Sequence, residues 1–177
     1  MRRNLNLDNG FDLRPAVASD APRIALWMSQ PHIQRWWHQD WSVERWAQEI
    51  ERQAEGEYSA PCVAAVDAED FGYVELYRAR HDRLAEYYTS DEHDWGVHLA
   101  IGDVTRVGRG LGRQLLRALA DALVRADPAC QRVVAEPDIE NTPSVRAFVA
   151  AGFVPQGELQ LPDKTALLMV RTRTVEA

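Results

Sequence analysis

Residues 107–124 read VGRGLGRQLLRALADALV, a turn with three glycines that runs directly into an amphipathic helix. Gly108, Gly110 and Gly112 occupy alternate positions of the turn. The apolar residues that follow the third glycine recur at helical spacing, with polar residues between them. Before the turn, Trp95 to Ile101 alternates as a strand does, so the glycines stand between a strand and a helix.

A glycine turn at the start of a helix is suited to holding a bulky anion. Glycine has no Cβ atom, so successive amide N–H groups can converge on the anion. The positive end of the helix, which begins near Gly110, adds to the attraction. Arg106, Arg109 and Arg113 concentrate positive charge here, although the net charge of the whole chain is −7. The sequence therefore predicts a phosphate-binding turn.

Closely spaced glycines also occur in turns of other kinds. The spacing GxGxG is a weak signal alone, and a flexible turn with solvated arginines has the same residues. A Walker A loop would end in Gly-Lys-Ser or Gly-Lys-Thr, which is missing. A dinucleotide fingerprint would need GxGxxG, and this turn also comes only after several strands. The decision depends on the elements around the turn.

The hydrophobic pattern predicts an α/β domain with a mixed sheet. Strands are expected at 11–15, 60–66, 71–77, 95–101, 132–135, 153–161 and 166–171. Helices are expected from a Ser19 cap to Met28, from a Ser42 cap to just before Gly56, through 114–124, and from Asn141 to Ala151. Pro31 is expected to close the first helix, and the polar stretch 78–94 is expected to be a functional loop.

Composition limits the classes of function. A chain of 177 residues with 46% hydrophobic residues is expected to form one domain, spanning residues 1–177. The net negative charge argues against nucleic acid as a partner and suits a cationic substrate. No apolar run approaches the roughly 20 residues that span a bilayer, and no signal peptide precedes the first strand, so we expect a cytoplasmic protein without a membrane partner. Cys62 and Cys130 are expected to be structural.

The order of elements resembles the GCN5-related N-acetyltransferase (GNAT) superfamily over nearly the whole chain. The glycine turn after the fourth strand, Asn141 after the fifth, and Ala151-Gly152-Phe153 carry this resemblance. It implies a mostly antiparallel mixed sheet with splayed fourth and fifth strands and flanking helices. It also implies acyl-CoA, such as acetyl-CoA or succinyl-CoA, as co-substrate. The residues it assigns to acyl-CoA are Ile101, Val107, Gly108, Arg109, Gly110, Gly112, Arg113, Asn141 and Arg146.

Two positions depart from the superfamily pattern. The glutamine or arginine that usually opens the turn is replaced by Val107, with Arg106 adjacent. The tyrosine that often protonates the leaving thiolate, seven residues after the asparagine, is replaced by Phe148. A phenyl ring cannot donate a proton, so either another group serves as the acid or none is needed.

Three longer strings resemble the siderophore-pathway N-acyltransferases of the aerobactin, mycobactin and desferrioxamine types. They are Tyr87-Tyr88, DWGVHLAIG at 94–102 and EPDIENT at 136–142. This resemblance implies acyl transfer to a primary or N-hydroxylated amine, of the N-hydroxylysine or N-hydroxycadaverine type. A weaker resemblance is to the aminoglycoside 6′-N-acetyltransferases, through Trp36-Trp37 and the turn near Pro162-Asp163. A non-catalytic acyl-CoA-binding module that regulates a partner remains a further alternative.

His98 and Asp138 are the candidate catalytic residues. They lie at or near the ends of the fourth and fifth strands, which are expected to diverge around the thioester. The histidine has a pKa suited to accepting the proton of an attacking amine near neutral pH. Asp138 could attract the amine or orient it, and its structural alternative is to cap the following helix. A backbone N–H of Leu99 or Ala100 is the expected oxyanion donor.

Trp36, Trp37, Tyr87 and Tyr88 are the expected lining of the acceptor side, since a linear alkylamine needs an apolar channel. Their alternative role is ordinary packing. The remaining histidines lack metal-ligand spacing, so no metal site is expected. The partner is expected to be a small-molecule amine, and the protein to be a monomer or a homodimer. The sequence leaves open the acyl chain, the exact acceptor and the group that protonates the CoA thiolate.

Overall fold

The computed structural model describes residues 5–174 of the chain. The strands are β1 (Phe11–Pro15), β2 (Ser59–Val66), β3 (Glu69–Arg78), β4 (Trp95–Ile101), β5 (Arg132–Ala135), β6 (Val154–Gln160) and β7 (Thr165–Thr172). The helices are α1 (Ala21–Met28), α2 (Pro31–Trp37), α3 (Val43–Glu55), α4 (Leu111–Ala126) and α5 (Thr142–Ala150). Short 3₁₀ turns occupy Ala18–Asp20, Ala79–His81, Arg83–Glu86 and Val104–Arg106.

The strands form one sheet in the order β1-β2-β3-β4-β5-β7-β6. All neighbours are antiparallel except β4 and β5, which are parallel. The β4–β5 ladder has only two paired positions, Trp95 with Val133 and Gly96 with Val134. Beyond these pairs the two strands part, so the expected splayed strands and mixed, mostly antiparallel sheet are confirmed.

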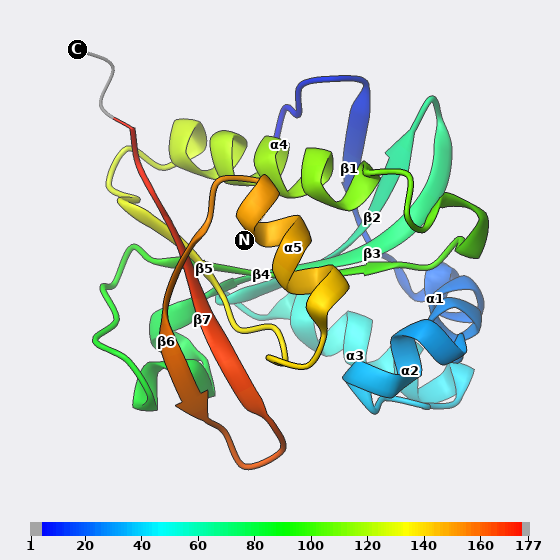
Figure 1. Ribbon diagram of the computed structural model, residues 1–177. Helices are drawn as coiled ribbons and strands as arrows, with labels where there is room; N and C mark the ends of the chain where they lie inside the picture. The colour runs from blue at the N-terminus through cyan, green and yellow to red at the C-terminus, as the bar shows by residue number, and fades with distance from the viewer. Residues whose placement is uncertain (1–4, 175–177) are drawn as a thin grey trace.

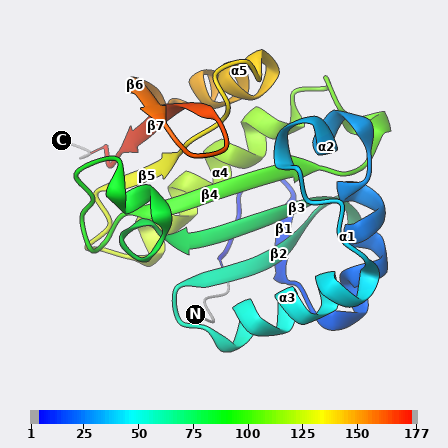
Figure 2. The same ribbon diagram turned by 90° about the horizontal axis from the view of Figure 1, so that it is seen from below.

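The helices cover both faces of the sheet, as Figures 1 and 2 show. On one face α4 buries leucines such as Leu115 and Leu119 against the strands, and α5 buries Phe148. On the other face α1 and α3 bury Ile24, Trp46 and Ile50. Each such side chain contributes about 1.5–3 kcal/mol when fully buried. Within residues 5–174, none of the helices is both long and apolar enough to cross a membrane.

Strand alternation assigns the residues of β4 to these two faces. Val97 and Leu99 pack with the core beneath α4, whereas Ala100 packs with the core beneath α3. Successive side chains of a strand point to opposite faces, so His98 points to the same side as Ala100. The candidate histidine therefore faces α2 and α3 across the sheet from the α4 core.

The predicted elements are confirmed with two corrections. Pro31 does not close the first helix; it begins α2, because proline fits the first turn of a helix. Ser19 does not cap α1, since it lies in a 3₁₀ turn and Asp20 occupies the cap position. The Asp20 carboxylate instead accepts hydrogen bonds from Arg14 and from the backbone of Val17. The Ser42 cap of α3 is confirmed.

Candidate active site

A cleft of about 410 Å³ opens where β4 and β5 part. Strands β3, β4 and β5 supply its floor, α2 and α3 one wall, and α5 with the β6–β7 turn the other. Its lining includes five of the residues that the sequence singles out, namely His98, Asp138, Asn141, Trp36 and Trp37. The structure thus brings both catalytic candidates into one cleft.

His98 lies between two carboxylates at the centre of this cleft. Its Nε2 atom is 2.6 Å from Glu136 Oε1, and its Nδ1 atom is 3.3 Å from Glu75 Oε2. Glu75 is the cross-strand partner of His98 on β3, and Glu136 follows the last residue of β5. An imidazole that is protonated on both nitrogens can donate to both acceptors at once. The three residues form a carboxylate–imidazolium–carboxylate cluster.

The charges of this cluster shift its pKa values strongly. Burial lowers the pKa of His98, but the charge of Glu136 and the hydrogen bonds to both carboxylates outweigh it and raise that pKa to about 10. Burial raises the pKa of Glu136, yet His98 lowers it overall to about 2. The pKa of Glu75 is also lowered by its hydrogen bond to His98, against the effect of burial. The expected near-neutral pKa of His98 is therefore wrong, because sequence could not reveal its two anionic partners.

Two buried tyrosines hold the carboxylates in place. Tyr77 donates from its hydroxyl to Glu136 Oε2 at 2.8 Å, and Tyr73 donates to Glu75 Oε1 at 2.8 Å. The ring of Tyr77 also lies against the ring of His98, with centroids 4.7 Å apart. Both carboxylates and the imidazole thus have fixed orientations before any substrate arrives.

Asp138 and Asn141 shape the turn that leads into α5. Asp138 accepts the backbone N–H of Glu140 at 2.8 Å through Oδ1, and Asn141 accepts that of Ser144 at 3.2 Å. Asp138 therefore stabilises the turn before α5 but does not cap the helix, because the cap is Asn141, and it also lines the cleft. The Asn141 side-chain nitrogen has no hydrogen-bond partner within residues 5–174, so it can donate to a ligand.

The glycine turn has the backbone geometry that an anion site requires. Gly108 and Gly110 have φ angles of +76° and +80°, in the left-handed region that side chains disfavour. A Cβ atom added at Gly108 would meet nothing within 4 Å, so the turn is open on that side. Gly112, at the start of α4, packs instead on Ile101, whose Cδ1 lies 3.4 Å from the position of such an atom.

The arginines around the turn divide into paired and unpaired groups. Arg106 forms ion pairs with Asp103 and Glu69, so the expectation that its charge serves the turn is not supported. Arg109, Arg113 and Arg146 are exposed. Among the arginines in the described part of the chain, these three alone form no ion pair, hydrogen bond or ring contact. They are the cations available to a phosphate-bearing ligand.

Strand geometry identifies the backbone N–H group of β4 that faces the gap between β4 and β5. Gly102 donates its N–H to Phe71 on the β3 side. Backbone groups alternate in direction along a strand, so the N–H of Leu99 points the other way, toward β5. The ladder to β5 has ended before this position. Of the two candidate donors that the sequence offers, Leu99 and not Ala100 directs its N–H into the gap.

The aromatic candidates separate into two groups. Trp36 and Trp37 line the cleft, and the ring of Trp37 meets that of His98 edge-on with centroids 5.8 Å apart. Tyr87 and Tyr88 do not line it. The hydroxyl of Tyr88 donates to Asp94 Oδ2 at 3.0 Å instead, and Arg132 lies over its ring. The resemblance in this loop therefore does not place these two tyrosines at the acceptor side.

Sequence reasoning missed Glu75, Glu136 and Gln53. Glu136 stands in the EPDIENT string, but the string alone does not indicate what this residue does. The sequence does indicate that Glu75 is unusual, because it is the acidic residue in the middle of the apolar run Phe71–Tyr77. A carboxylate at such a position of a buried strand is rare without a partner.

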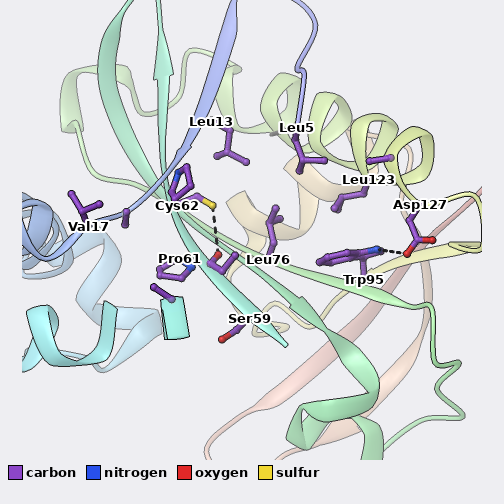
Figure 3. Close-up of a pocket in the computed structure, with 15 residues that line it drawn as sticks. Leu5, Leu13, Val17, Ser59, Pro61, Cys62, Leu76, Trp95, Leu123 and Asp127 are labelled. Atoms are coloured by element: carbon purple, nitrogen blue, oxygen red, sulfur yellow. Dashed lines mark hydrogen bonds between the residues drawn. The ribbon is translucent and has the colours of Figure 1, made fainter. Parts of the chain in front are cut away.

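A second cavity, of about 400 Å³, lies at the β1–β2 edge beside the end of α4 (Figure 3). It shares no lining residue with the cleft. Asp127 at its rim accepts hydrogen bonds from Trp95 and Arg78. Burial raises the pKa of the Cys62 thiol to about 12, so this cysteine is unreactive and structural.

The parted strands, the glycine turn and the charged cleft have together the form of an enzyme that transfers an acyl group from a CoA thioester. A family model described as an acetyltransferase (GNAT) domain matches residues 16–161. The chain belongs to this GNAT family. It is an acyl-CoA-dependent N-acyltransferase, and acyl-CoA is its co-substrate.

The chain is similar to several named members of the family. The chain is 38% identical over 153 residues to the lysine N-acyltransferase MbtK of Mycobacterium tuberculosis, covering 86% of this chain and 73% of that protein. It is 34% identical over 161 residues to the N-hydroxyputrescine acetyltransferase of Acinetobacter baumannii, covering 89% and 76%. Among solved structures it is similar to AAC(6')-Ib bound to paromomycin and acetyl-CoA, with a TM-score of 0.82, 26% identity, and coverage of 93% and 94%.

The glycine turn gives a first test of the site. Replacing Gly110 with Ala is expected to raise the Kd for CoA about tenfold, because a left-handed alanine costs about 1–2 kcal/mol and distorts the amides. Its Cβ would also lie 3.2 Å from Arg113 Nε. Gly10→Ala is the matched control, since Gly10 has a similar φ of +72° with nothing within 4 Å. Calorimetric titration with CoA measures both; equal Kd values would contradict the assignment of this turn.

Proposed function

We propose that residues 1–177 form one acyltransferase domain that acylates an N-hydroxylated alkylamine, of the N-hydroxylysine or N-hydroxycadaverine type, in siderophore biosynthesis. The observation that carries the proposal is the Glu75–His98–Glu136 cluster in the cleft where β4 and β5 part. The relative named for N-hydroxyputrescine supports this acceptor class, and the relative named for lysine supports an alkylamine acceptor more generally. A cytoplasmic location, where acyl-CoA is formed, belongs to this proposal.

The charge of the cleft favours a cationic acceptor. Six carboxylates line it, and only three cationic side chains do. The carboxylates belong to Glu49, Glu75, Asp82, Glu136, Asp138 and Asp163, and the cations to Arg83, His98 and Lys164. An excess of one sign in a cleft concentrates ligands of the opposite sign. We therefore assign the amine acceptor, with Trp36 and Trp37 along its alkyl chain, to this cleft.

The co-substrate fits the residues beside the cleft. The backbone at Gly108 and Gly110, both with positive φ, suits a pyrophosphate, and the unpaired Arg109 and Arg113 are adjacent to it in sequence. The unpaired Arg146, on α5, is a third cation proposed for the cofactor phosphates. Val107, Ile101 and Asn141 would border the rest of the cofactor. When bound, acyl-CoA supplies an electrophilic thioester carbonyl. The N–H of Leu99 would donate to that carbonyl oxygen as negative charge develops on it.

The Glu75–His98–Glu136 cluster stabilises the attacking nitrogen of the acceptor. A hydroxylamine nitrogen is less basic than an alkylamine and is largely unprotonated near neutral pH, so it needs no strong base before attack. As it attacks, it acquires positive charge and its proton becomes acidic. Glu75, His98 and Glu136 together hold one net negative charge, which stabilises that nitrogen, and one of the two carboxylates accepts its proton while His98 stays protonated. His98 thus acts as a fixed imidazolium between the two acids, and Asp138 adds negative charge at the rim.

Among the described residues that line the cleft, Ser144 alone has a side-chain hydroxyl group. Phe148 lines the cleft at the position of the usual tyrosine, and Ser144 lines it one helical turn earlier. Residues four apart share a helix face. The Ser144 hydroxyl forms no hydrogen bond within residues 5–174, so it is free to donate a hydrogen bond to the developing thiolate.

Thiol release tests the proposal directly. The protein is incubated with acetyl-CoA or succinyl-CoA and with N-hydroxycadaverine, N-hydroxylysine or kanamycin, and free CoA is followed. We expect release with the hydroxylamines. Release with kanamycin alone would replace the proposal by aminoglycoside acetylation. CoA binding without release for any amine would indicate a non-catalytic acyl-CoA-binding module.

A further inference from the structure

Two side chains in the lining of the cleft have buried oxygen atoms that accept no hydrogen bond. Gln53 on α3 is only 7% exposed and lines the cleft, and its Oε1 atom is buried without a hydrogen-bond partner. Gln39 Oε1, from the segment after α2, is a second buried acceptor without a partner in the same lining. Buried polar atoms are nearly always hydrogen-bonded. Two unsatisfied acceptors in one cleft therefore point to a donor that arrives with a ligand.

The orientation of Gln53 is fixed by its neighbours. Its Nε2 atom donates to Glu49 Oε1 at 2.8 Å and to Glu75 Oε1 at 3.0 Å. An amide turned the other way would direct an oxygen at two carboxylates, which accept and cannot donate. Oε1 must therefore face away from both acids, as an acceptor. We call Gln53 and Glu49, which are joined by a hydrogen bond, the acceptor recess.

The recess is coupled to the reacting centre by a single side chain. Glu75 accepts from Gln53 through Oε1 and from His98 through Oε2. The Glu75 carboxylate therefore joins the recess to the cluster. Arg52 is already bound to both oxygens of Glu49 from the solvent side. It is not among the residues that line the cleft.

We infer that the acceptor recess binds the distal ammonium group of the acyl acceptor, through Gln53 Oε1 with Glu49 beside it. An ammonium group has three donors and no acceptor, which matches the unsatisfied oxygens. A carboxylate at that end of the substrate would face only acceptors and would be repelled. The inference rests on the proposed function and makes it narrower: short diamines hydroxylated on one nitrogen are the preferred acceptors, ahead of N-hydroxylysine.

A pair of acceptors that differ by one nitrogen tests the recess. N-hydroxycadaverine and N-hydroxypentylamine have the same chain and the same reacting group, but only the first has a distal ammonium. With acetyl-CoA, the diamine is expected to have a kcat/KM at least about tenfold higher, the usual effect of a charge-assisted hydrogen bond. A ratio near one in the unmodified protein would overturn the inference.

Variants locate the effect at the recess. Gln53→Met keeps the volume of the side chain and removes the acceptor, so the ratio is expected to fall to about twofold or less. If the substitution only disturbed the structure through Glu75, kcat/KM would fall equally for both acceptors and their ratio would stay unchanged. That result would overturn the inference. Glu49→Gln, which removes the charge beside Gln53, is expected to lower the ratio as well. Glu51→Gln, exposed on the same helix, is the matched control and should change nothing.

Binding separates failure of the recess from failure of the proposed function. Calorimetry with N-hydroxycadaverine and with N-hydroxypentylamine, in the absence of acyl-CoA, needs no turnover. Suppose that no hydroxylamine is acylated, yet the diamine binds more tightly than the monoamine and Gln53→Met removes that difference. The binding role of the recess is then supported and the proposed function is rejected. Equal binding of the two amines would overturn the recess whatever the outcome of the activity assays.

Discussion

Replacing Glu136 with Gln is expected to lower kcat/KM for a hydroxylamine acceptor by about 10²–10³, the range of a missing acid–base contribution. Gln keeps the shape of the side chain and an oxygen for the His98 hydrogen bond. What it removes is the charge that makes the cluster net negative. The nitrogen that becomes positive during attack then meets a neutral cluster, so the barrier rises.

The control for this variant is Glu140→Gln, four residues later and exposed. It removes one negative charge from the same loop without touching His98. Steady-state thiol release with N-hydroxycadaverine compares the two, and far-ultraviolet circular dichroism checks that both are folded. A Glu136→Gln protein within about twofold of the unmodified rate would show that this carboxylate serves the fold alone.

Replacing Gly96 with Ala is expected to lower Tm by about 5–10 °C and to abolish most activity. A Cβ atom at position 96 would lie 2.1 Å from ring carbons of Tyr77, which is 5% exposed and cannot move freely. Overpacking of this kind costs about 1–3 kcal/mol, and each kcal/mol shifts Tm by about 2–4 °C at this size. Displacing Tyr77 also removes the hydroxyl that holds Glu136.

A double-mutant cycle isolates the clash at Gly96. In a Tyr77→Leu background the smaller side chain leaves room for the added methyl group, so Gly96→Ala is expected to cost less than in the unmodified protein. Thermal unfolding of the four proteins gives the coupling. Additive losses in Tm would mean that the glycine is required for another reason.

The strings that carry the family resemblance have physical roles in the structure. Gly96 in the Gly-Val-His string makes room for Tyr77, whose hydroxyl fixes Glu136. Asn141 caps α5 and keeps its amide nitrogen free. Hydrophobic periodicity and cap residues were sufficient to predict β4 and α5, because strand alternation and helix caps depend on residues close in sequence.

The missed features depend on contacts between distant segments. Glu75 and His98 are 23 residues apart in the chain and meet only through the β3–β4 register. His98 and Glu136 meet because β5 begins parallel to β4 before the strands part. Sequence alone does not give these registers, so the charged state of His98 could not be predicted. The helix α2 was missed because Pro31 equally signals a helix start or a stop.

The cluster also links stability to pH. The pKa of His98 is raised from 6.5 to about 10, so its contribution to stability is complete below pH 6.5 and is lost as the pH rises through 10. The pKa of Glu136 is lowered from 4.5 to about 2, so its contribution is complete above pH 4.5 and is lost as the pH falls through 2. His98 and Glu136 therefore both contribute fully to stability between pH 4.5 and pH 6.5.

The charge state of His98 is the most direct test of this mechanism. Nitrogen-15 NMR of histidine-labelled protein, with His98→Gln to assign the signals, reports the protonation of both ring nitrogens as a function of pH. We predict that His98 stays protonated on both nitrogens through pH 8, and that Glu136→Gln lowers its pKa. A His98 that titrates near pH 6.5 in the unmodified protein would contradict the carboxylate–imidazolium–carboxylate site.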